Sequence, residues 1–375
     1  MKSNASTLTE RNQKTMKKKF NIGWGLTNKC NMSCLFCYSE NARKNQKECG
    51  IEDWKKFVDR NHQYIEAINY GTGENSIIDE FFFFVEYVRE KYPAISQALT
   101  TNGYVSERVF EDSYFFEVFK NCIDDVDISI DFNDSEKHGD FRGQATAYKW
   151  AKQALQLSKN LKKITTIVFV GCKDTVNKEN LDGLFRLCKK YDAFLRMNIY
   201  RPVNSSSEIN DKFILSYDSL IAGLQYINDN YEIVSLSDAL LGNVFTTQES
   251  IKDLTGISSI RILPDGSIYP STYLITAEYR NMYSIREADL SVLKFEDFEN
   301  VEIPKECGGC VFLDCCSGGV YDRRILWYGT LAERDPYCPT RHGSKFPKIS
   351  LNASKHSRIS IHDGYLPTLF FKNPI

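Results

Sequence analysis

GWGLTNKCNMSCLFCY, residues 23–38, places Cys30, Cys34 and Cys37 at C-x3-C-x2-C spacing directly after an apolar run. With 12 cysteines in 375 residues, random placement would give such a triplet about 0.01 times, so the spacing indicates a site. Three thiolates are one short of the four protein ligands of a structural zinc site. They suffice to hold three irons of a [4Fe–4S] cluster and to leave the fourth iron open. The stretch therefore predicts an iron–sulfur centre with one open coordination position.

The composition argues against several classes of protein. A net charge of −2 and a pI near 6.3 give no electrostatic footprint for nucleic acid or for an anionic membrane surface. The sequence has no run of about 18 apolar residues and no signal-peptide pattern, so we expect a cytoplasmic protein. Cysteines without a secretion signal favour metal ligation over disulfides, and an iron–sulfur cluster requires a reducing compartment.

Short apolar runs alternate with helical patterns from residue 20 onward, which is typical of βα units and a parallel sheet. Six strand–helix alternations in about 210 residues are too few for a complete eight-fold barrel. The expected strands are 20–26, a short apolar stretch ending at Tyr70, 95–99, 126–130, 164–170 and 194–200. The expected helices are 53–68, 78–92, 109–119, a helix between Gly143 and Leu157, 181–191 and 217–227, with a polar loop over 131–143.

The cysteine loop resembles that of the radical S-adenosylmethionine (radical SAM) enzymes. The resemblance covers residues 19–230 and implies an α/β fold, a partial (β/α)6 TIM-like barrel whose βα loops build the site on one rim. In that family the open iron is chelated by the amino and carboxylate groups of S-adenosylmethionine. An electron from the cluster then cleaves the sulfonium to a 5′-deoxyadenosyl radical, which abstracts hydrogen from the substrate. By the same resemblance, Phe36 lies near the adenine.

Further contacts to S-adenosylmethionine follow from the resemblance. Thr72-Gly73-Glu74 looks like the family's Gly-Gly-Glu motif with a threonine first, so that the backbone approaches the methionine end and Glu74 accepts its ammonium. Arg142 resembles the arginine of the Arg-Gly loop in peptide-modifying members, with Ser129 on the preceding strand; a solvated surface arginine is the alternative. The other contacts implied by the family are Thr101 and Asn102 for ribose or substrate, and Met197 for adenine, with core packing as the alternative for Met197.

A second cysteine set lies between residues 307 and 338. By spacing alone, zinc and an iron–sulfur cluster both fit four separated thiols. The arrangement resembles the C-terminal extension called SPASM, or its shorter form Twitch, and the C-x2-C-x5-C spacing of that extension selects Cys316 over Cys315. A full SPASM region has two more cysteines where this chain has Ser258 or Ser259 and Ser271, so we expect one auxiliary [4Fe–4S] cluster. Its expected ligands are Cys307, Cys310, Cys316 and Cys338.

The rest of the chain divides around these two regions. We expect a disordered tail over 1–18, a connector over 231–256, a SPASM/Twitch-like domain over 257–345 that begins with a hairpin, and a C-terminal tail over 346–375. The sequence does not identify the catalytic residue. If the C-terminal tail folds over the barrel mouth, then His362, Asp363 or Tyr365 would offer a proton or a hydrogen atom; a turn without a catalytic part is the alternative. Cys315, a thiol that the auxiliary cluster does not need, is a further weak candidate.

Three functions are compatible with these patterns. The first is a radical SAM maturase that cross-links, oxidises or epimerises a ribosomally made precursor peptide with the help of an external one-electron reductant. The absence of a fused leader-binding domain leans against a peptide substrate, unless a separate leader-binding protein supplies that domain. The second is a radical SAM dehydrogenase or other enzyme acting on a small-molecule precursor. The third is a zinc- or cluster-binding interaction protein on nucleic acid, which the balanced charge disfavours. The motifs favour the first function, with neither nucleic acid nor membrane as a partner.

Overall fold

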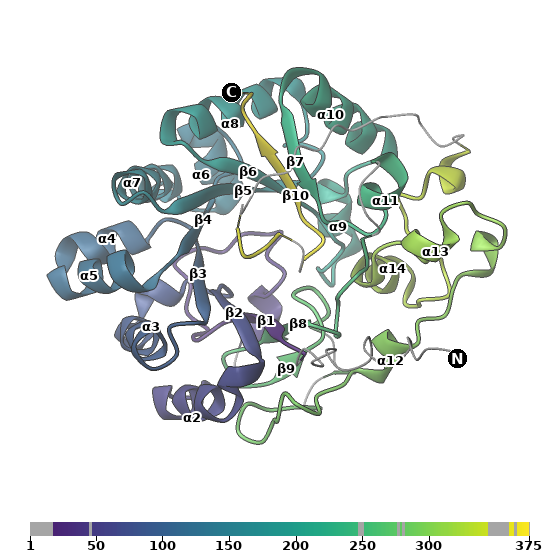
Figure 1. The fold of residues 1–375 in the computed structure, drawn as a ribbon. Helices are drawn as coiled ribbons and strands as arrows, with labels where there is room; N and C mark the ends of the chain where they lie inside the picture. Colours follow the sequence, from purple (N-terminus) through teal and green to yellow (C-terminus); the bar gives the residue numbers. More distant parts are fainter. Residues whose placement is uncertain are drawn as a thin grey trace, which may run out of the picture.

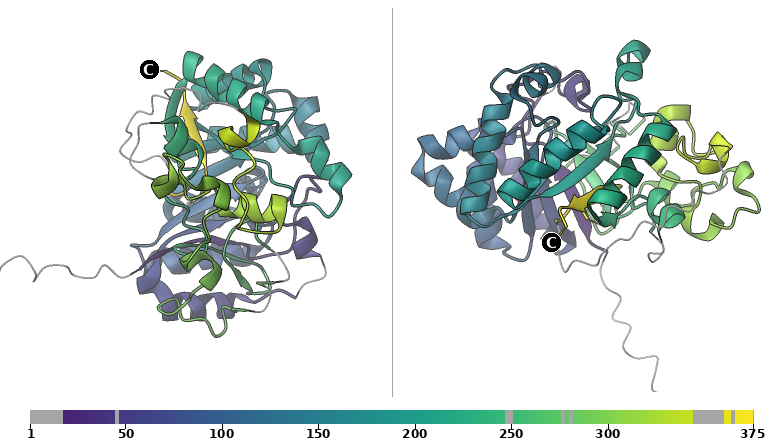
Figure 2. Two further views of the ribbon diagram at one scale, coloured as in Figure 1. Left: turned by 90° about the vertical axis from the view of Figure 1, so that its right-hand side faces the viewer. Right: turned by 90° about the horizontal axis from the view of Figure 1, so that it is seen from above.

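The structure is a computed structural model that describes residues 18–44, 47–246, 251–275, 278–279, 282–343, 360–363 and 366–374. A curved sheet forms its centre, helices cover the outside, and the cysteine-rich region lies against one side (Figures 1 and 2). The strands are β1 (Phe20–Trp24), β2 (Ile65–Tyr70), β3 (Ser96–Thr101), β4 (Asp125–Ser129), β5 (Ile164–Gly171), β6 (Phe194–Ile199), β7 (Glu232–Leu236), β8 (Ser259–Ile262), β9 (Ile268–Tyr269) and β10 (Leu369–Lys372).

Most of the longer helices follow the strands of the sheet. They are α2 (Ile51–Asn61), α3 (Asp79–Lys91), α4 (Val105–Glu111), α5 (Ser113–Cys122), α6 (Ser135–Arg142), α7 (Ala147–Asn160), α8 (Lys178–Tyr191), α9 (Ser207–Phe213) and α10 (Tyr217–Asn230). The shorter or later ones are α1 (Glu40–Arg43), α11 (Leu241–Phe245), α12 (Glu296–Glu299), α13 (Leu313–Cys316) and α14 (Tyr321–Tyr328). The 3-10 turns are η1 (His62–Tyr64), η2 (Asn75–Ile77), η3 (Lys305–Cys307) and η4 (Pro339–His342). Within the described ranges, no helix is both long and apolar enough to cross a membrane.

Strands β1 to β6 pair side by side, in chain order and all parallel. Each is followed by helical sequence that returns the chain to the amino end of the next strand. The α/β class and the partial (β/α)6 barrel predicted from the sequence are therefore confirmed. The carboxyl ends of all six strands meet at one rim, which is where a site is expected in such a fold.

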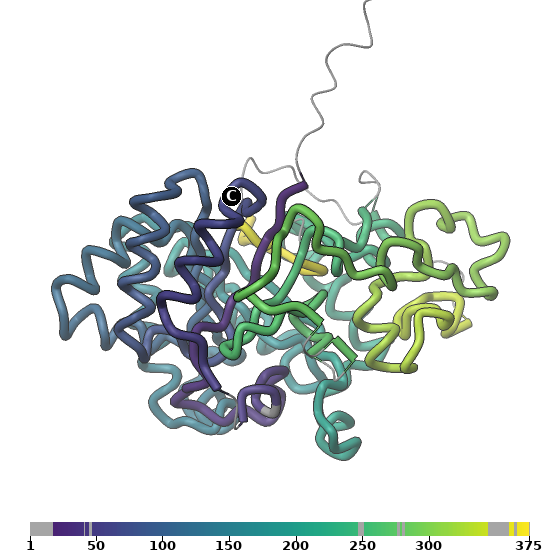
Figure 3. The backbone as a smooth tube through the Cα atoms, turned by 90° about the horizontal axis from the view of Figure 1, so that it is seen from below, coloured from purple at the N-terminus to yellow at the C-terminus, as the bar shows by residue number. Residues whose placement is uncertain are grey.

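Later segments extend both edges of this sheet. Strand β8 runs parallel to β1, with Arg261 opposite Gly23, and carries β9 beyond it as an antiparallel hairpin; Figure 3 shows β1 and the hairpin side by side from below. At the other edge, β10 lies antiparallel between β6 and β7, which places Phe370 opposite Arg196. The end of the chain is thus built into the barrel sheet.

Three local predictions were wrong. The helix predicted over 53–68 ends at Asn61, and the sequence from Ile65 forms β2, because its apolar residues satisfy helical spacing as well as strand spacing. The loop predicted over 131–143 contains α6, whose N-cap Asp134 accepts the Lys137 backbone N–H. The helix predicted over 109–119 is two helices, because Asp112 ends α4 and caps α5.

Aromatic side chains fix the helices to the outer face of the sheet. Trp24 on β1 meets Phe57 of α2 and Phe84 of α3 edge to face, with both centroid distances at 5.4 Å. All three side chains are fully buried, and burial of each contributes roughly 2–3 kcal/mol. In the phenylalanine block of α3, Phe83 is the exposed member at 45%, as the helical period requires.

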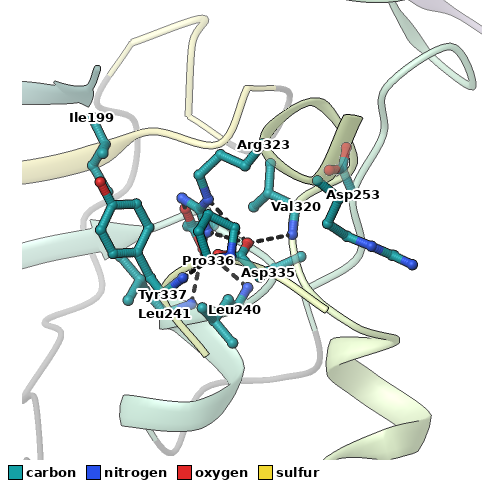
Figure 4. A network of polar contacts seen from close by, with 12 residues as sticks. Ile199, Leu240, Leu241, Asp253, Val320, Arg323, Asp335, Pro336 and Tyr337 are labelled. Carbon is teal, nitrogen blue, oxygen red and sulfur yellow. Dashed lines mark hydrogen bonds and ion pairs between the residues drawn. The ribbon is translucent and has the colours of Figure 1, made fainter. Parts of the chain in front are cut away.

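Buried ion pairs join the cysteine-rich region to the barrel. Arg323 of α14 pairs with Asp238, which follows β7, at 2.5 Å. It also pairs with Asp335 at 2.7 Å (Figure 4). Arg201, just beyond β6, pairs with Asp322 of α14 at 2.6 Å. All of these side chains are at most 1% exposed, so removing one partner would leave an uncompensated buried charge. The pairs fix the cysteine-rich region beside the rim on which the strands end.

Candidate functional site

A cavity of roughly 1200 Å³, counted with its opening to solvent, lies at the carboxyl ends of β1 to β6. Each of these strands, or the loop that follows it, contributes lining residues. Because parallel strands direct their carboxyl ends to the same rim, side chains from six distant parts of the sequence converge here.

The three cysteines of the loop after β1 all line this cavity. The Cys37 backbone N–H donates to the Cys34 carbonyl at 3.1 Å, which forms a turn between these two cysteines. Burial raises the pKa of Cys30 to about 11 and that of Cys34 to about 12. These thiols stay protonated at neutral pH unless a metal displaces the proton. Two arginines, Arg43 and Arg142, line the same cavity and favour the thiolates electrostatically.

The loop after β2 packs directly on the cysteine loop. The Glu74 backbone N–H donates to the Lys29 carbonyl at 2.9 Å. A Cβ atom on Gly73 would lie 2.6 Å from that same carbonyl oxygen and 2.7 Å from the Thr27 carbonyl oxygen, so only glycine fits. Gly73 and Thr72 both have positive φ, 68° and 114°. Such conformations suit glycine, and where glycine occupies them a ligand can approach the backbone closely.

Glu74 is 1% exposed, and its carboxylate accepts hydrogen bonds from three residues. The donors are the Ser76 hydroxyl at 2.7 Å, the Thr101 hydroxyl at 3.0 Å and the Asn102 backbone N–H at 2.8 Å. Burial raises the pKa of Glu74 in spite of these bonds. Thr101 and Asn102 line the cavity as expected for contacts, and in this structure their donors orient the Glu74 carboxylate.

Arg142 enters the cavity from the end of α6, where Gly143 in the left-handed conformation closes the helix. Its Nε donates to Asp131 Oδ2 at 2.6 Å, and its guanidinium lies 5.1 Å from the centre of the Phe36 ring. Both Phe36 and Ser129 line the cavity. The arginine is 9% exposed, so the alternative of a solvated surface side chain does not apply.

Comparison with known proteins agrees with this geometry. Residues 24–188 match the family model described as the radical SAM superfamily. That stretch of the chain is a radical SAM domain. Mycofactocin maturase MftC from Mycobacterium tuberculosis is 22% identical over 342 residues, which cover 86% of this chain and 83% of that protein. MftC from Mycolicibacterium smegmatis is also 22% identical, with 84% and 82% covered.

Two groups of solved structures share the fold. SuiB from Streptococcus suis, bound to precursor peptide SuiA, superposes with a TM-score of 0.66 at 15% identity over 86% of this chain and 76% of that one. Native anSMEcpe with bound AdoMet gives a TM-score of 0.66 at 19% identity, covering 86% and 95%. At these identities the likeness concerns the fold. The cofactors that accompany this family, a [4Fe–4S] cluster and S-adenosylmethionine, are those that the sequence predicts.

The residues of the radical SAM domain fit these two groups. The cavity is lined by the three cysteines together with Glu74 and Arg142, a carboxylate and a guanidinium that match an ammonium and a carboxylate. In the described ranges, no three His, Cys, Asp or Glu side chains are placed to hold a single metal ion. The ligand role of both cysteine sets therefore stays a prediction, made from the chemistry of their thiols.

Met197 does not line the cavity and is fully buried in the core. It packs against Gly171 at the end of β5, where an added Cβ atom would lie 2.7 Å from Met197 Cγ. Its neighbours Arg196 and Asn198 line the cavity instead, because successive side chains of a strand point to opposite faces. The adenine contact expected of Met197 is incompatible with this orientation, and the core alternative is correct.

The C-terminal candidates occupy different places. His362 lines the cavity, and its Nδ1 lies 2.7 Å from Asp127 Oδ2 on β4. Asp363 does not line it; its Oδ1 accepts hydrogen bonds from Ser235 at 2.5 Å and Ser237 at 2.7 Å, which fastens the tail to β7. Tyr365 lies outside the described residues. Burial lowers the pKa of His362 to about 4, so the ring is neutral near pH 7.

Several lining residues carry no motif in the sequence. Arg196, Arg261, Tyr38 and Tyr273 all line the cavity, although sequence reasoning singled out none of them. Tyr38 follows Cys37 directly, which is the one signal that would have identified it. Arg261 reaches the cavity because β8 joins β1, a pairing that no local pattern reveals.

The second cysteine set gathers in the turns between η3 and η4. Burial raises the pKa of Cys307, and the neighbouring Cys338 and Cys310 raise it further. Burial also raises the pKa of Cys316, with contributions from Cys338 and Cys307. These mutual effects place the four expected ligands near one another. The Cys315 thiol donates to the Phe312 carbonyl at 3.3 Å. The choice of Cys316 over Cys315 as the third ligand stays a prediction.

Proposed function

We propose that this protein is a radical SAM enzyme that modifies a ribosomally made precursor peptide. The observation that carries the proposal is the convergence of the three thiols of one loop, Glu74 and Arg142 on a single cavity at the carboxyl rim. When bound, the cluster and S-adenosylmethionine supply a 5′-deoxyadenosyl radical. The chain's own residues bind and orient these groups and exclude water from them.

Each lining residue has a role in this proposal. The thiolates of Cys30, Cys34 and Cys37 hold three irons, Glu74 accepts the ammonium of S-adenosylmethionine, and Arg142 receives its carboxylate. Further proposed contacts are Phe36 for adenine, the Thr72 and Gly73 backbone for the methionine end, and Ser129, Thr101 and Asn102 at the rim.

A peptide substrate is supported by a solved structure that shares the fold. SuiB, which shares the fold, is seen bound to a precursor peptide. A separate leader-binding protein and an external one-electron reductant complete the proposed system, and the demand for reduced thiols favours the cytoplasm.

Residues 257–345 form the proposed auxiliary region. Cys307, Cys310, Cys316 and Cys338 would close the coordination of one further [4Fe–4S] cluster, which fits an electron relay for an oxidative product such as a cross-link. Arg324 supports this region by donating to the backbone carbonyls of Ser317, Glu302, Glu333 and Leu331.

The test is anaerobic release of 5′-deoxyadenosine from protein reconstituted with iron and sulfide. We expect release that rises when short peptides encoded beside the gene are added, and none from Cys34→Ala. Cys122→Ala is the matched control, because Cys122 is a buried thiol of α5 away from the cavity. Purified protein that contains zinc without iron, or equal release from Cys34→Ala, would refute the proposal.

A further inference from the structure

The wall of the cavity holds more positive than negative charge. Among the described residues that line it are five arginines, Arg43, Arg142, Arg196, Arg201 and Arg261, and one acidic residue, Glu74. Three of the arginines have a buried carboxylate behind them: Asp131 for Arg142, Asp127 for Arg196 and Asp322 for Arg201. Arg43 lies by the cysteine loop, where it donates to Ser39 and acts on the Cys30 thiol. Arg261 differs from these four, because among the described residues it pairs with neither a carboxylate nor a cysteine thiol.

Arg261 is a buried cation, 2% exposed. Its Nη2 donates to the Tyr38 hydroxyl at 2.5 Å, to the Gly71 carbonyl and to the Thr72 hydroxyl. Among the residues that the structure describes, its Nε has no hydrogen-bond partner. In the part of the chain that the structure describes, no Asp or Glu forms an ion pair with it. A buried charge without a counterion is costly, so a residue of this kind in a cavity is suited to an anion that arrives from outside.

The surroundings of Arg261 are shaped to hold its guanidinium in place. On the neighbouring strand, Gly23 lies opposite Arg261, and a Cβ atom there would overlap the guanidinium. The first glycine of the GWG sequence thus provides the space that the arginine occupies. The guanidinium lies 5.5 Å from the centre of the Tyr38 ring, which meets the Tyr273 ring at 5.6 Å. The Arg201 guanidinium lies 4.1 Å from the centre of the Tyr273 ring.

Arg261 reaches the cavity from β8, beside the loop that follows β2. It donates to the Thr72 hydroxyl and therefore lies next to the proposed contacts to the methionine end. Arg142 and Ser129, the proposed cofactor contacts of the β4 side, are four strands away in the sheet order. The binding of S-adenosylmethionine to an Arg261 variant therefore distinguishes a carboxylate of the substrate from that of the cofactor.

We propose that Arg261, beside the hydroxyl group of Tyr38, binds a carboxylate of the substrate. The inference rests on the proposed function, because an unmodified peptide offers no anion other than carboxylates. A planar guanidinium fork matches a carboxylate in a bidentate manner, and the Tyr38 hydroxyl adds a donor. The carboxylate belongs either to the carboxyl terminus of the peptide or to an Asp or Glu side chain.

The experiment measures binding to the anaerobically reconstituted full-length protein in the presence of S-adenosylmethionine. The probes are pools of N-acetylated hexapeptides in four forms, with or without Asp and Glu and with a free or an amidated carboxyl terminus. Retained peptides are quantified by mass spectrometry after ultrafiltration. The variants are Arg261→Gln, which removes the charge, and Arg261→Lys, which keeps it. Arg60→Gln is the matched control, because Arg60 also binds backbone carbonyls, those of Ile285 and Ala288, outside the cavity.

We expect the wild type to retain carboxylate-bearing peptides at least about tenfold more than the fully neutral pool. Arg261→Gln should abolish this preference, Arg261→Lys should keep part of it and Arg60→Gln all of it. The pool that is retained identifies the source, terminal or side chain. Equal retention of the neutral pool, unchanged preference in Arg261→Gln, or retention of no pool overturns the inference.

Two further outcomes separate this inference from others. If Arg261→Gln weakens S-adenosylmethionine binding about tenfold, the anion belongs to the cofactor and the inference is overturned. If carboxylate-dependent retention occurs but no pool or neighbouring peptide stimulates 5′-deoxyadenosine release, the proposed function fails while the role of Arg261 stands.

Discussion

Thr72 holds a backbone conformation that β-branched residues rarely adopt, with φ at 114°. The sequence shows it as a departure from a glycine, and the structure shows that the position still demands the glycine conformation. The adjoining Gly73 leaves no room for a Cβ atom against the cysteine loop. Backbone strain of this kind persists where the surroundings hold it and is concentrated at functional sites. The loop that contains Thr72 and Gly73 therefore packs closely against the cysteine loop.

His138 makes the stability of the protein depend on pH. It is fully buried behind Arg142, and its Nδ1 accepts the Asp131 backbone N–H at 3.2 Å. Burial lowers the pKa of His138 to about 4, against about 6.5 in an unfolded chain. Between these values the unfolded state binds more protons, so the free energy of unfolding falls as the pH falls.

We therefore expect His138 to contribute a loss of about 2 kcal/mol in the free energy of unfolding between pH 7 and pH 5. In His138→Asn, which retains an acceptor for Asp131, that part of the pH dependence should disappear. Urea denaturation at the two pH values measures it, with the exposed His62→Asn as the control. An identical pH dependence in wild type and His138→Asn would contradict the assignment.

The residues that the sequence could identify are those whose chemistry is written in local spacing. The cysteine triplet and the loop ending in Glu74 needed no knowledge of the tertiary structure. Met197 was ambiguous because a strand shows which residues alternate but not which set faces the cavity. Arg261 was missed because its place depends on the pairing of two strands that are more than 230 residues apart in sequence.

At the scale of elements, α14 is held to the end of β6 by polar contacts. Ser271, which stands where a full SPASM region has a cysteine, donates to Asp322 at 3.2 Å, and Asp322 pairs with Arg201. A buried hydrogen-bonded ion pair thus occupies the region in which a further cluster would have needed its ligand. The pair links the barrel to the cysteine-rich region without a metal.

Replacing one residue of the Arg201–Asp322 pair should destabilise the protein more than replacing both. Arg201→Met or Asp322→Leu alone should lower the free energy of unfolding by about 3–5 kcal/mol, because each leaves a buried charge unpaired. The double variant should lose less than the sum of the two. Urea denaturation measures all three, with the exposed pair Lys120–Glu117 as the control, where loss should be below about 0.5 kcal/mol. Strictly additive losses would show that the two charges do not interact.

The order of βα units was readable from the sequence, whereas boundaries depended on competing local signals. The apolar residues from Tyr64 to Tyr70 fit both a helix and a strand, and only the pairing of β2 with β1 and β3 decides between them. Helix α6 escaped notice because its sequence is mostly polar and contains Gly139. The insertion of β10 between β6 and β7 depends on contacts made after the whole barrel has formed.

On the scale of the whole molecule, two sets of cysteines lie in two regions joined by buried ion pairs. Reconstituted wild type should contain about eight irons per chain, and Cys34→Ala and Cys310→Ala about four each. Cys34→Ala should release no 5′-deoxyadenosine, whereas Cys310→Ala should release it without forming product. Iron analysis and chromatography measure both, with Cys122→Ala as the control. Retention of eight irons in Cys310→Ala would contradict a cluster at the second set.

The most direct test concerns the open iron of the first set. Cys310→Ala isolates that cluster, so its electron paramagnetic resonance spectrum after reduction can be recorded without and with S-adenosylmethionine. A spectrum that changes when S-adenosylmethionine is added is the predicted result, because the molecule binds the iron that the three cysteines leave free. An unchanged spectrum from an intact cluster would mean that all four irons have protein ligands, and the proposed chemistry would then be wrong.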